Sequence, residues 1–469
     1  MKPSKMSRAI PLFVAFLATA SILWLLTTSL RSPGFAERPL NFGEPTGPVT
    51  AGARSTAPAS APTGFNNSNV AIQNLPGSWP GFRGPNGDNI SPEKVPLAHQ
   101  WGAGMPRPLW SVQMGEGYAA AAIDAGRVFV LDYDQAAQLD SLRCFSLADG
   151  SEIWRRSTPD TVKRNHGMSR TIPAVHGKYV VGLGPKCNLV CADTTTGKLN
   201  WQHDLVQEYG VTVPEWYAGQ CPLIDGEKAI IAPCGTKALM VAFDLATGKP
   251  AWQTPNTTGW QMTHVSISAT TFKGQKMYVY CGSGGVAGVM AKDGKLAWQN
   301  NEWTVNTAAV PSPLSIGDGR LLLTGGYGAG AAILQISEVG GQYSAKIEKR
   351  FTPDVFGSDQ HTPILYGGNI YGVRAGGELV CMDLNGKILW SSGAARFGLG
   401  PYMIADGLIY LLNDSGILSI AEASPLGYKQ LGQAQILSGP DAWGPLALAG
   451  GRLIARDLNK MVCLDVSAK

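Results

Sequence analysis

The chain has 469 residues, of which 15% are charged, and its formal net charge is +4. So weak a positive field excludes nucleic acid as the expected partner. The 58 glycines and 31 prolines exclude a mainly helical protein and favour many short strands joined by turns, and 44% hydrophobic residues suffice for a large core.

Residues 1–30 have the pattern of a signal anchor. The stretch 9–30 is uncharged and long enough to cross a bilayer as a transmembrane helix. It follows three basic residues, Lys2, Lys5 and Arg8. Because positive charge stays on the cytoplasmic side, the bulk of the chain is expected outside the cytosol, in the periplasm. The alternative is a signal peptide cleaved before Glu37, which would make the protein secreted.

Residues 31–78 are rich in Pro, Ala, Gly, Ser, Thr and Asn, so they are expected to form a disordered linker. No cysteine precedes Cys144, which excludes a lipid-modified cysteine as the anchor. The folded part is expected to extend over 79–469.

A short phrase recurs in the folded part. It reads CADTTTGKLNW at 191–201, AFDLATGKPAW at 242–252 and, shortened, CMDLNGKILW at 381–390. Recurrence at this spacing marks a repeated structural unit. The Asp and Gly suit a tight turn, and the closing Trp suits a flat ring wedged between neighbouring sheets. Each phrase is therefore interpreted as the outer hairpin of a four-stranded sheet.

The outer-strand aromatic residue marks each unit. These docking residues are Trp110, Trp154, Trp201, Trp252, Trp298, Phe351 and Trp390, before a degenerate unit near Tyr428. The stretch after 442 has three strands, and PRPLWSV at 106–112 reads as the missing fourth. Joining them closes the ring and removes its open sheet edges. The sequence thus predicts an all-β fold, an eight-bladed β-propeller with four-stranded antiparallel blades, behind the transmembrane helix and linker.

The recurring phrase combines an Ala or Cys, an Asp, a Thr-Gly-Lys turn and a closing Trp. This combination resembles the tryptophan-docking repeat of the PQQ-repeat, quinoprotein alcohol dehydrogenase-like β-propellers. WPGFRGPNGDNIS at 79–91 also resembles the N-terminal lead-in of exported, planctomycete-type PQQ-binding-like propellers. The resemblance covers about 79–469 and implies the fold. It does not imply an activity, because the repeat marks blade packing and the family includes an envelope assembly factor as well as enzymes.

The dehydrogenases of this family have a vicinal disulfide over the quinone, a calcium ion held by Glu, Asn and Asp, and a catalytic Asp. This sequence has no Cys-Cys dipeptide and no acidic cluster that matches that set. No catalytic residue, metal ligand or cofactor is therefore predicted. The leading hypothesis is a membrane-tethered, extracytoplasmic scaffold that binds envelope proteins and is not an enzyme. The alternative is a periplasmic oxidoreductase that uses PQQ with calcium.

Eight cysteines in an exported chain raise the question of disulfides. Four replace Ala242 in equivalent strands and are expected to be reduced core residues: Cys144, Cys191, Cys381 and Cys463. Three others recur near the ends of second strands, Cys187, Cys234 and Cys281. Core positions are favoured over a metal site for these three, because neighbouring blades hold equivalent positions too far apart to share a metal.

The loops that lead into the blades carry the candidate partner-binding side chains. They are His166, Arg170, Trp216, Gln220, Trp260, His264, Trp303, Asp359, His361 and Trp443. We expect them to face a central funnel, where aromatic rings give contact area and a few polar groups give orientation. The alternative is that these side chains only seal the funnel.

Overall fold

The computed structural model describes residues 65–68, 72–102 and 104–468, all of which belong to the unit Ala61–Lys469. The expected transmembrane helix at 9–30 and most of the expected linker lie outside these residues. Within the described ranges, no helix has the length and apolar character needed to span a bilayer.

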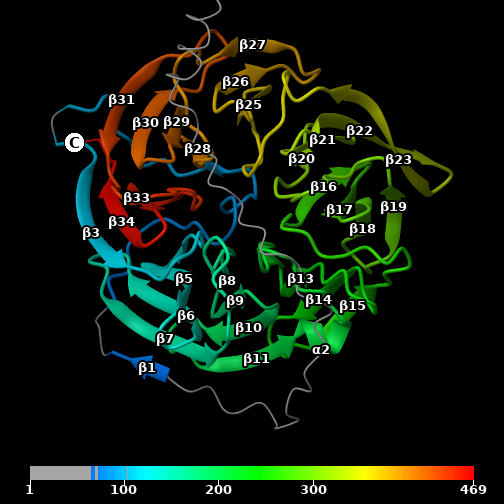
Figure 1. Cartoon of the computed structure of the whole chain (residues 1–469), viewed down its shortest axis with the longest axis horizontal. Helices are drawn as coiled ribbons and strands as arrows, with labels where there is room; N and C mark the ends of the chain where they lie inside the picture. Colours follow the sequence, from blue (N-terminus) through cyan, green and yellow to red (C-terminus); the bar gives the residue numbers. More distant parts are fainter. Residues whose placement is uncertain (1–64, 69–71, 103, 469) are drawn as a thin grey trace, which may run out of the picture. The chain divides into compact units, whose positions relative to one another are not determined.

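Eight sheets follow one another around a central axis (Figure 1). Seven of them contain four antiparallel strands that are consecutive in the chain. The eighth combines the last three strands of the chain with one strand that precedes the first blade. The predicted eight-bladed propeller is therefore confirmed. The strands of blades 1 to 4 are β4 (Ala122–Asp124), β5 (Arg127–Asp134), β6 (Leu139–Ser146) and β7 (Glu152–Pro159); β8 (Ala174–His176), β9 (Tyr179–Leu183), β10 (Asn188–Asp193) and β11 (Leu199–Asp204); β12 (Leu223–Asp225), β13 (Lys228–Ile231), β14 (Met240–Asp244) and β15 (Pro250–Thr254); β16 (Ser268–Phe272), β17 (Gln275–Gly282), β18 (Gly285–Met290) and β19 (Leu296–Asn300).

The second half of the ring repeats this order. The strands of blades 5 to 8 are β20 (Leu314–Ser315), β21 (Arg320–Gly325), β22 (Gly330–Val339) and β23 (Gln342–Phe351); β24 (Ile364–Tyr366), β25 (Asn369–Val373), β26 (Leu379–Met382) and β27 (Ile388–Ser391); β28 (Tyr402–Ala405), β29 (Leu408–Leu412), β30 (Ile417–Glu422) and β31 (Gln430–Gln435); β32 (Ala447–Ala449), β33 (Arg452–Arg456) and β34 (Lys460–Asp465) with β3 (Arg107–Gln113).

In the part of the chain that the structure describes, three further elements stand outside the repeat. Strand β1 (Phe65–Asn67) pairs with the outer strand β7, and β2 (Ile90–Ser91) pairs in parallel with the innermost strand β28. The helix α2 (Leu205–Tyr209) follows β11 and is capped at its N-terminus by Asp204.

The recurring phrase forms the outer hairpin, as the sequence predicts. In blade 2, Cys191 pairs with Trp201, and the register shifts directly after Cys191. Asp193 Oδ1 accepts hydrogen bonds from the backbone N–H groups of Thr195 and Thr196, at 3.0 and 2.7 Å. Gly197 then adopts a φ of 68°, a left-handed conformation that favours glycine.

The outer tryptophans dock onto the following blade. Four indole N–H groups donate to backbone carbonyls there: Trp110 to Leu147 (3.0 Å), Trp154 to Thr194 (3.1 Å), Trp201 to Leu245 (2.8 Å) and Trp390 to Ser424 (2.9 Å). The turn glycine of the next blade lies against the ring, so that a Cβ on Gly197 would come 2.7 Å from Trp154. Trp252 packs on Gly294 of blade 4 in the same way, whereas Trp298 lies over Gly288 of its own blade.

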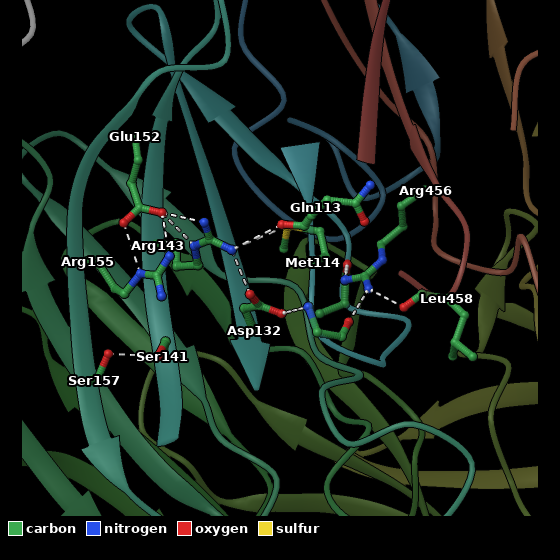
Figure 2. Close-up of polar contacts among 12 residues, drawn as sticks. Gln113, Met114, Asp132, Ser141, Arg143, Glu152, Arg155, Ser157, Arg456 and Leu458 are labelled. Carbon is green, nitrogen blue, oxygen red and sulfur yellow. Dashed lines mark hydrogen bonds and ion pairs between the residues drawn. The ribbon is translucent and has the colours of Figure 1, made fainter. Parts of the chain in front are cut away.

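Strand β3 closes the ring by pairing with β34, with Trp110 opposite Cys463. The predicted closure is therefore confirmed. A buried polar network holds the segment that runs from β3 to blade 1 (Figure 2). Arg456 donates to the carbonyl oxygens of Gly115 at 3.0 Å and Ala119 at 2.9 Å. Asp132 accepts from the Gly115 N–H at 2.8 Å and from Arg143 Nη1 at 2.7 Å.

The axial segment, residues 79–91, lies along the innermost strands at the centre of the ring (Figure 1). Trp79 forms a backbone bridge with Ile123 of blade 1, and the Val175 N–H of blade 2 donates to the carbonyl of Pro80 at 2.7 Å. On the other side, Ile90 pairs with Ile404 of blade 7.

Arg83 fixes the middle of the axial segment. It is buried, and its two Nη atoms donate to the carbonyls of Thr362 and Pro363 before β24, at 2.9 and 3.1 Å. Burial lowers the pKa of Arg83 to about 10. The sequence predicts a lead-in here; the structure places it against the innermost strands β4 and β28 and the chain before β24.

All eight cysteines are buried free thiols. The four that replace Ala242 lie in core strands opposite an outer tryptophan, as predicted: Cys144, Cys191, Cys381 and Cys463. Cys187, Cys234 and Cys281 are also buried in the core, as predicted; Cys281 lies in β17, whereas Cys187 and Cys234 follow the ends of β9 and β13, with φ values of 66° and 45°. Cys221 links two blades, since its Sγ accepts from the Ile172 N–H at 3.3 Å.

Candidate functional site: an aromatic and cationic cluster on the loop face

The loops before β4 and β32 meet in an aromatic stack. Tyr118 stacks on Trp443, and the ring centroids are 5.2 Å apart. The Tyr118 hydroxyl donates to Asp441 Oδ2 at 3.3 Å, and the Trp443 indole N–H donates to Asp414 Oδ1 at 2.7 Å. Burial and then the charge of Asp441 raise the pKa of Tyr118 to about 12, so that its hydroxyl is a neutral donor near pH 7.

Arg170, in the loop before β8, lies over the ring of this tyrosine. Its Cζ lies 5.2 Å from the centroid of the Tyr118 ring. Nη2 donates to three backbone carbonyls of its own loop, those of Asn165 (3.0 Å), His166 (2.8 Å) and Gly167 (3.3 Å). Nε is buried and has no hydrogen-bond partner in the described chain. The loop therefore holds the guanidinium in place and leaves part of its donor capacity unused.

The charge of Arg170 acts on side chains from other blades. Burial and then this charge lower the pKa of His264 to about 4, so the imidazole is neutral above that pH. The His264 ring lies 6.2 Å from that of Trp216. Tyr327, in the turn before β22, has 59% of its surface exposed, and the charge of Arg170 opposes the rise that burial causes in its pKa.

We define the mouth cluster as Tyr118, Arg170, His264, Tyr327, Asp441 and Trp443. Its members come from blades 1, 2, 4, 5 and 8, so that only the closed ring brings them together. Three of them, Arg170, His264 and Trp443, are among the residues predicted from the sequence.

Asp359 and His361 lie in a second place, a small recess that also includes Leu399 and Tyr402. His361 Nε2 lies 3.0 Å from the carbonyl oxygen of Leu399, which requires Nε2 to carry a proton. Burial lowers the pKa of His361 to about 4 and raises the pKa of Asp359. Both side chains are therefore shifted towards their neutral forms.

Three of the sequence-predicted residues are buried within blades. Gln220 is fully buried and bonds both backbone groups of Ala232, accepting at 2.7 Å and donating at 3.0 Å. Trp260 packs against the glycines that start β18, and Trp303 is equally enclosed. These three side chains do not face a funnel, and we leave them out of the candidate site. His166 is exposed, and its backbone oxygen supports Arg170.

Residues 138–392, more than half of the chain, match the PQQ-repeat family described as outer membrane protein assembly factor BamB. The chain belongs to this family. The resemblance drawn from the recurring phrase is thereby confirmed.

Individual relatives agree with this family at low identity. The outer membrane protein assembly factor BamB of Yersinia pestis is 22% identical over 280 residues, which is 56% of this chain and 66%, just under two thirds, of that protein. The crystal structure of BamB from Moraxella catarrhalis aligns with 76% of this chain and 99% of its own, at 13% identity and a TM-score of 0.53, which shows a shared fold.

A quinohemoprotein alcohol dehydrogenase from Pseudomonas putida aligns with 84% of this chain and 81% of its own, at 11% identity and a TM-score of 0.45. This similarity is too low to indicate a shared activity. In residues 65–68, 72–102 and 104–468, no three His, Cys, Asp or Glu side chains are grouped so that they could hold a metal ion.

Sequence reasoning missed half of the mouth cluster. Tyr118 lies in the segment from β3 to β4, which resembles an ordinary strand connection in the sequence, and Asp441 lies in the same loop as the predicted Trp443 without being predicted itself. Tyr327 lies in a turn between second and third strands, at a φ of 54° between two glycines. A tyrosine in this left-handed conformation is a signal that the sequence alone does not give.

Proposed function

We propose that this protein is a non-enzymatic binding scaffold of the cell envelope, and that the mouth cluster is where it holds a partner protein. The observation that supports this most is the convergence of aromatic and charged side chains from five blades on the loop face, while the innermost strands β4 and β28 already pair with the axial segment. Such clusters of Trp, Tyr and Arg are typical of residues that dominate binding free energy.

The family supports the location and the class of partner. Its description names an outer membrane assembly factor, and the N-terminal sequence 9–30 predicts a membrane anchor with the propeller outside the cytosol. The partners of this chain are then other envelope proteins. No observation in the described residues favours the PQQ-dependent oxidoreductase. Quinone found in a denatured extract of the purified protein would support that alternative.

Site-specific photo-crosslinking in cells tests the proposal. A photoreactive residue replaces Tyr327 in the full chain, and a matched control replaces Leu426, which is 95% exposed in the turn between β30 and β31. We expect a discrete crosslink to one envelope protein from position 327 and none to that protein from position 426. Equal crosslinking from both positions, or none from position 327, would contradict a binding site at the mouth cluster.

Trp443→Ala, combined with the crosslinker at 327, separates binding from folding. Loss of the stacked ring should reduce the crosslink several-fold with a small change in melting temperature, because the side chain is only partly buried. A large fall in melting temperature with an unchanged crosslink would instead assign Trp443 to sealing the ring.

A further inference from the structure

The guanidinium of Arg170 lacks an anionic partner. All three of its hydrogen bonds to the described chain leave from Nη2 and reach neutral carbonyl oxygens. Burial lowers the pKa of Arg170, and no carboxylate of the described chain is among the groups that oppose this shift. A partly buried cation without a counter-ion is costly, and it is the arrangement that an arriving anion stabilises most.

Arg164 provides the contrast within the same loop. It is more than half exposed, and its Nε donates to Glu116 Oε2 at 2.6 Å. The loop thus carries one arginine that is neutralised by its own chain and one that is not. The carboxylates in and beside the cluster have other contacts: Asp441 accepts from Tyr118, Asp414 accepts from Trp443, and Asp359 lies beside Gly326 in the neighbouring recess.

The walls of the cluster favour an organic carboxylate beside an apolar group. Tyr118 and Trp443 present a stacked pair, and Tyr327 projects an exposed ring from the opposite part of the loop face. Rings at this position exclude water, which strengthens a charge-assisted hydrogen bond to Arg170. An isolated carboxylate ion gains nothing from these rings, whereas an acidic residue flanked by aromatic residues contacts both parts.

We propose that Arg170 is a specificity-determining residue that binds the carboxylate of an acidic, aromatic-flanked segment of the partner protein, with Tyr118, Trp443 and Tyr327 packing around it. The Nη1 group, which has no acceptor in the described chain, supplies the donors, whereas Nε is buried. This inference rests on the proposed function, because it states the chemistry by which the mouth cluster recognises its partner.

The test uses two peptides that differ only in charge. The probes are acetylated and amidated Gly-Phe-Asp-Phe-Gly and Gly-Phe-Asn-Phe-Gly, so that the single Asp carries the only charge. Isothermal titration calorimetry with the full chain in detergent measures both. We expect the Asp peptide to bind about tenfold or more tightly than the Asn peptide, since hydrogen bonds to charged groups contribute about 1.5 to 3 kcal/mol. Equal affinities would overturn the proposal without requiring any variant to fold.

Variants locate the effect. Arg170→Gln should lose the preference for the Asp peptide, Arg170→Lys should keep part of it, and Arg164→Gln should keep all of it. An equal loss in Arg170→Gln and Arg164→Gln would assign the preference to the general charge of the loop and overturn the site. Arg170-dependent binding to phosphatidylglycerol vesicles, with no preference between the peptides, would overturn it in favour of a lipid phosphate.

The crosslink from position 327 distinguishes this inference from the function on which it rests. If a partner is captured at position 327 and the two peptides bind with equal affinity, the proposed scaffold function stands and the proposed carboxylate site is contradicted. A charge preference for the peptides without any captured partner supports the anion site and contradicts the scaffold.

Discussion

Asp140 in β6 is a carboxylate whose charged form the folded protein stabilises poorly. Its Oδ1 is buried without a hydrogen bond in the described chain, and Arg156 shares the same small cavity between blades 1 and 2. Burial, followed by the charges of Asp160 and Asp132, raises the pKa of Asp140 to about 8 from 3.8. Ionisation of this side chain therefore opposes folding.

The sign of its pH dependence follows from this shift. Between pH 3.8 and 8 the unfolded chain ionises at Asp140 while the folded chain keeps the proton, so this residue's contribution to stability falls as pH rises through that window. Asp140→Asn should remove this dependence and raise the free energy of unfolding at pH 8 by about 1 to 3 kcal/mol. Urea unfolding at pH 5 and pH 8 measures it, with Asp134→Asn on the exposed end of β5 as the control. A variant less stable than the parent at pH 8 would contradict the argument.

The four cysteines opposite the outer tryptophans should stay reduced and unreactive in the native protein. Burial raises the pKa of each thiol, to about 12 for Cys191 and Cys463 and to about 11 for Cys381, and also raises that of Cys144, so that almost no thiolate forms near pH 7. Iodoacetamide labelling followed by mass spectrometry should modify them only after unfolding. Rapid native labelling of all four would show that the blade cores are open.

At the scale of the element, the docked tryptophan and the turn glycine form one unit. Gly197→Ala should destabilise the protein, because its Cβ would lie 2.7 Å from the Trp154 ring. Gly177→Ala is the matched control: both glycines have positive φ, but a Cβ at 177 meets no atom within 4 Å. We expect Gly197→Ala to lower the free energy of unfolding by about 1 to 3 kcal/mol more than the control, as measured in guanidinium. Equal losses of stability in the two variants would show that Gly197 is needed only for its backbone conformation.

The repeated hairpin was predictable because its information is local. Asp193, Gly197 and Trp201 lie within one phrase, and the pairing of Cys191 with Trp201 follows from the turn between them. The placement of the axial segment was not predictable, since Trp79 and Arg83 contact blades 1 and 6, hundreds of residues apart in sequence.

The position of a side chain in its loop likewise predicted only part of the candidate site. Gln220 occupies the same position relative to the following strand as His361, yet it bonds the backbone of Ala232 inside a blade. At this loop position, a side chain turns inward when a backbone N–H or C=O of the neighbouring strand lacks a hydrogen-bond partner. The sequence does not show which backbone groups lack one. Tyr327 joins the cluster from a different class of turn altogether.

At the scale of the whole molecule, stability depends on closure. Deleting residues 442–469 removes β32, β33 and β34 and leaves β3 unpaired, so two sheet edges become exposed. Calorimetry should show a lower, broader transition or aggregation. Shortening the exposed β22–β23 hairpin across 337–344 removes chain without opening the ring and should leave the transition cooperative. A deletion of 442–469 that melts at the parent temperature would show that closure adds nothing.

The pairing of β3 with β34 also sets an order of events during synthesis. Arg107 and Asp465 are paired across 358 residues of sequence, so β3 leaves the ribosome long before its partner exists. Until then β3 presents a free strand edge, and the axial segment has only part of its surroundings. The ring therefore completes after translation has passed Asp465, and a chain halted earlier exposes the surfaces that chaperones bind.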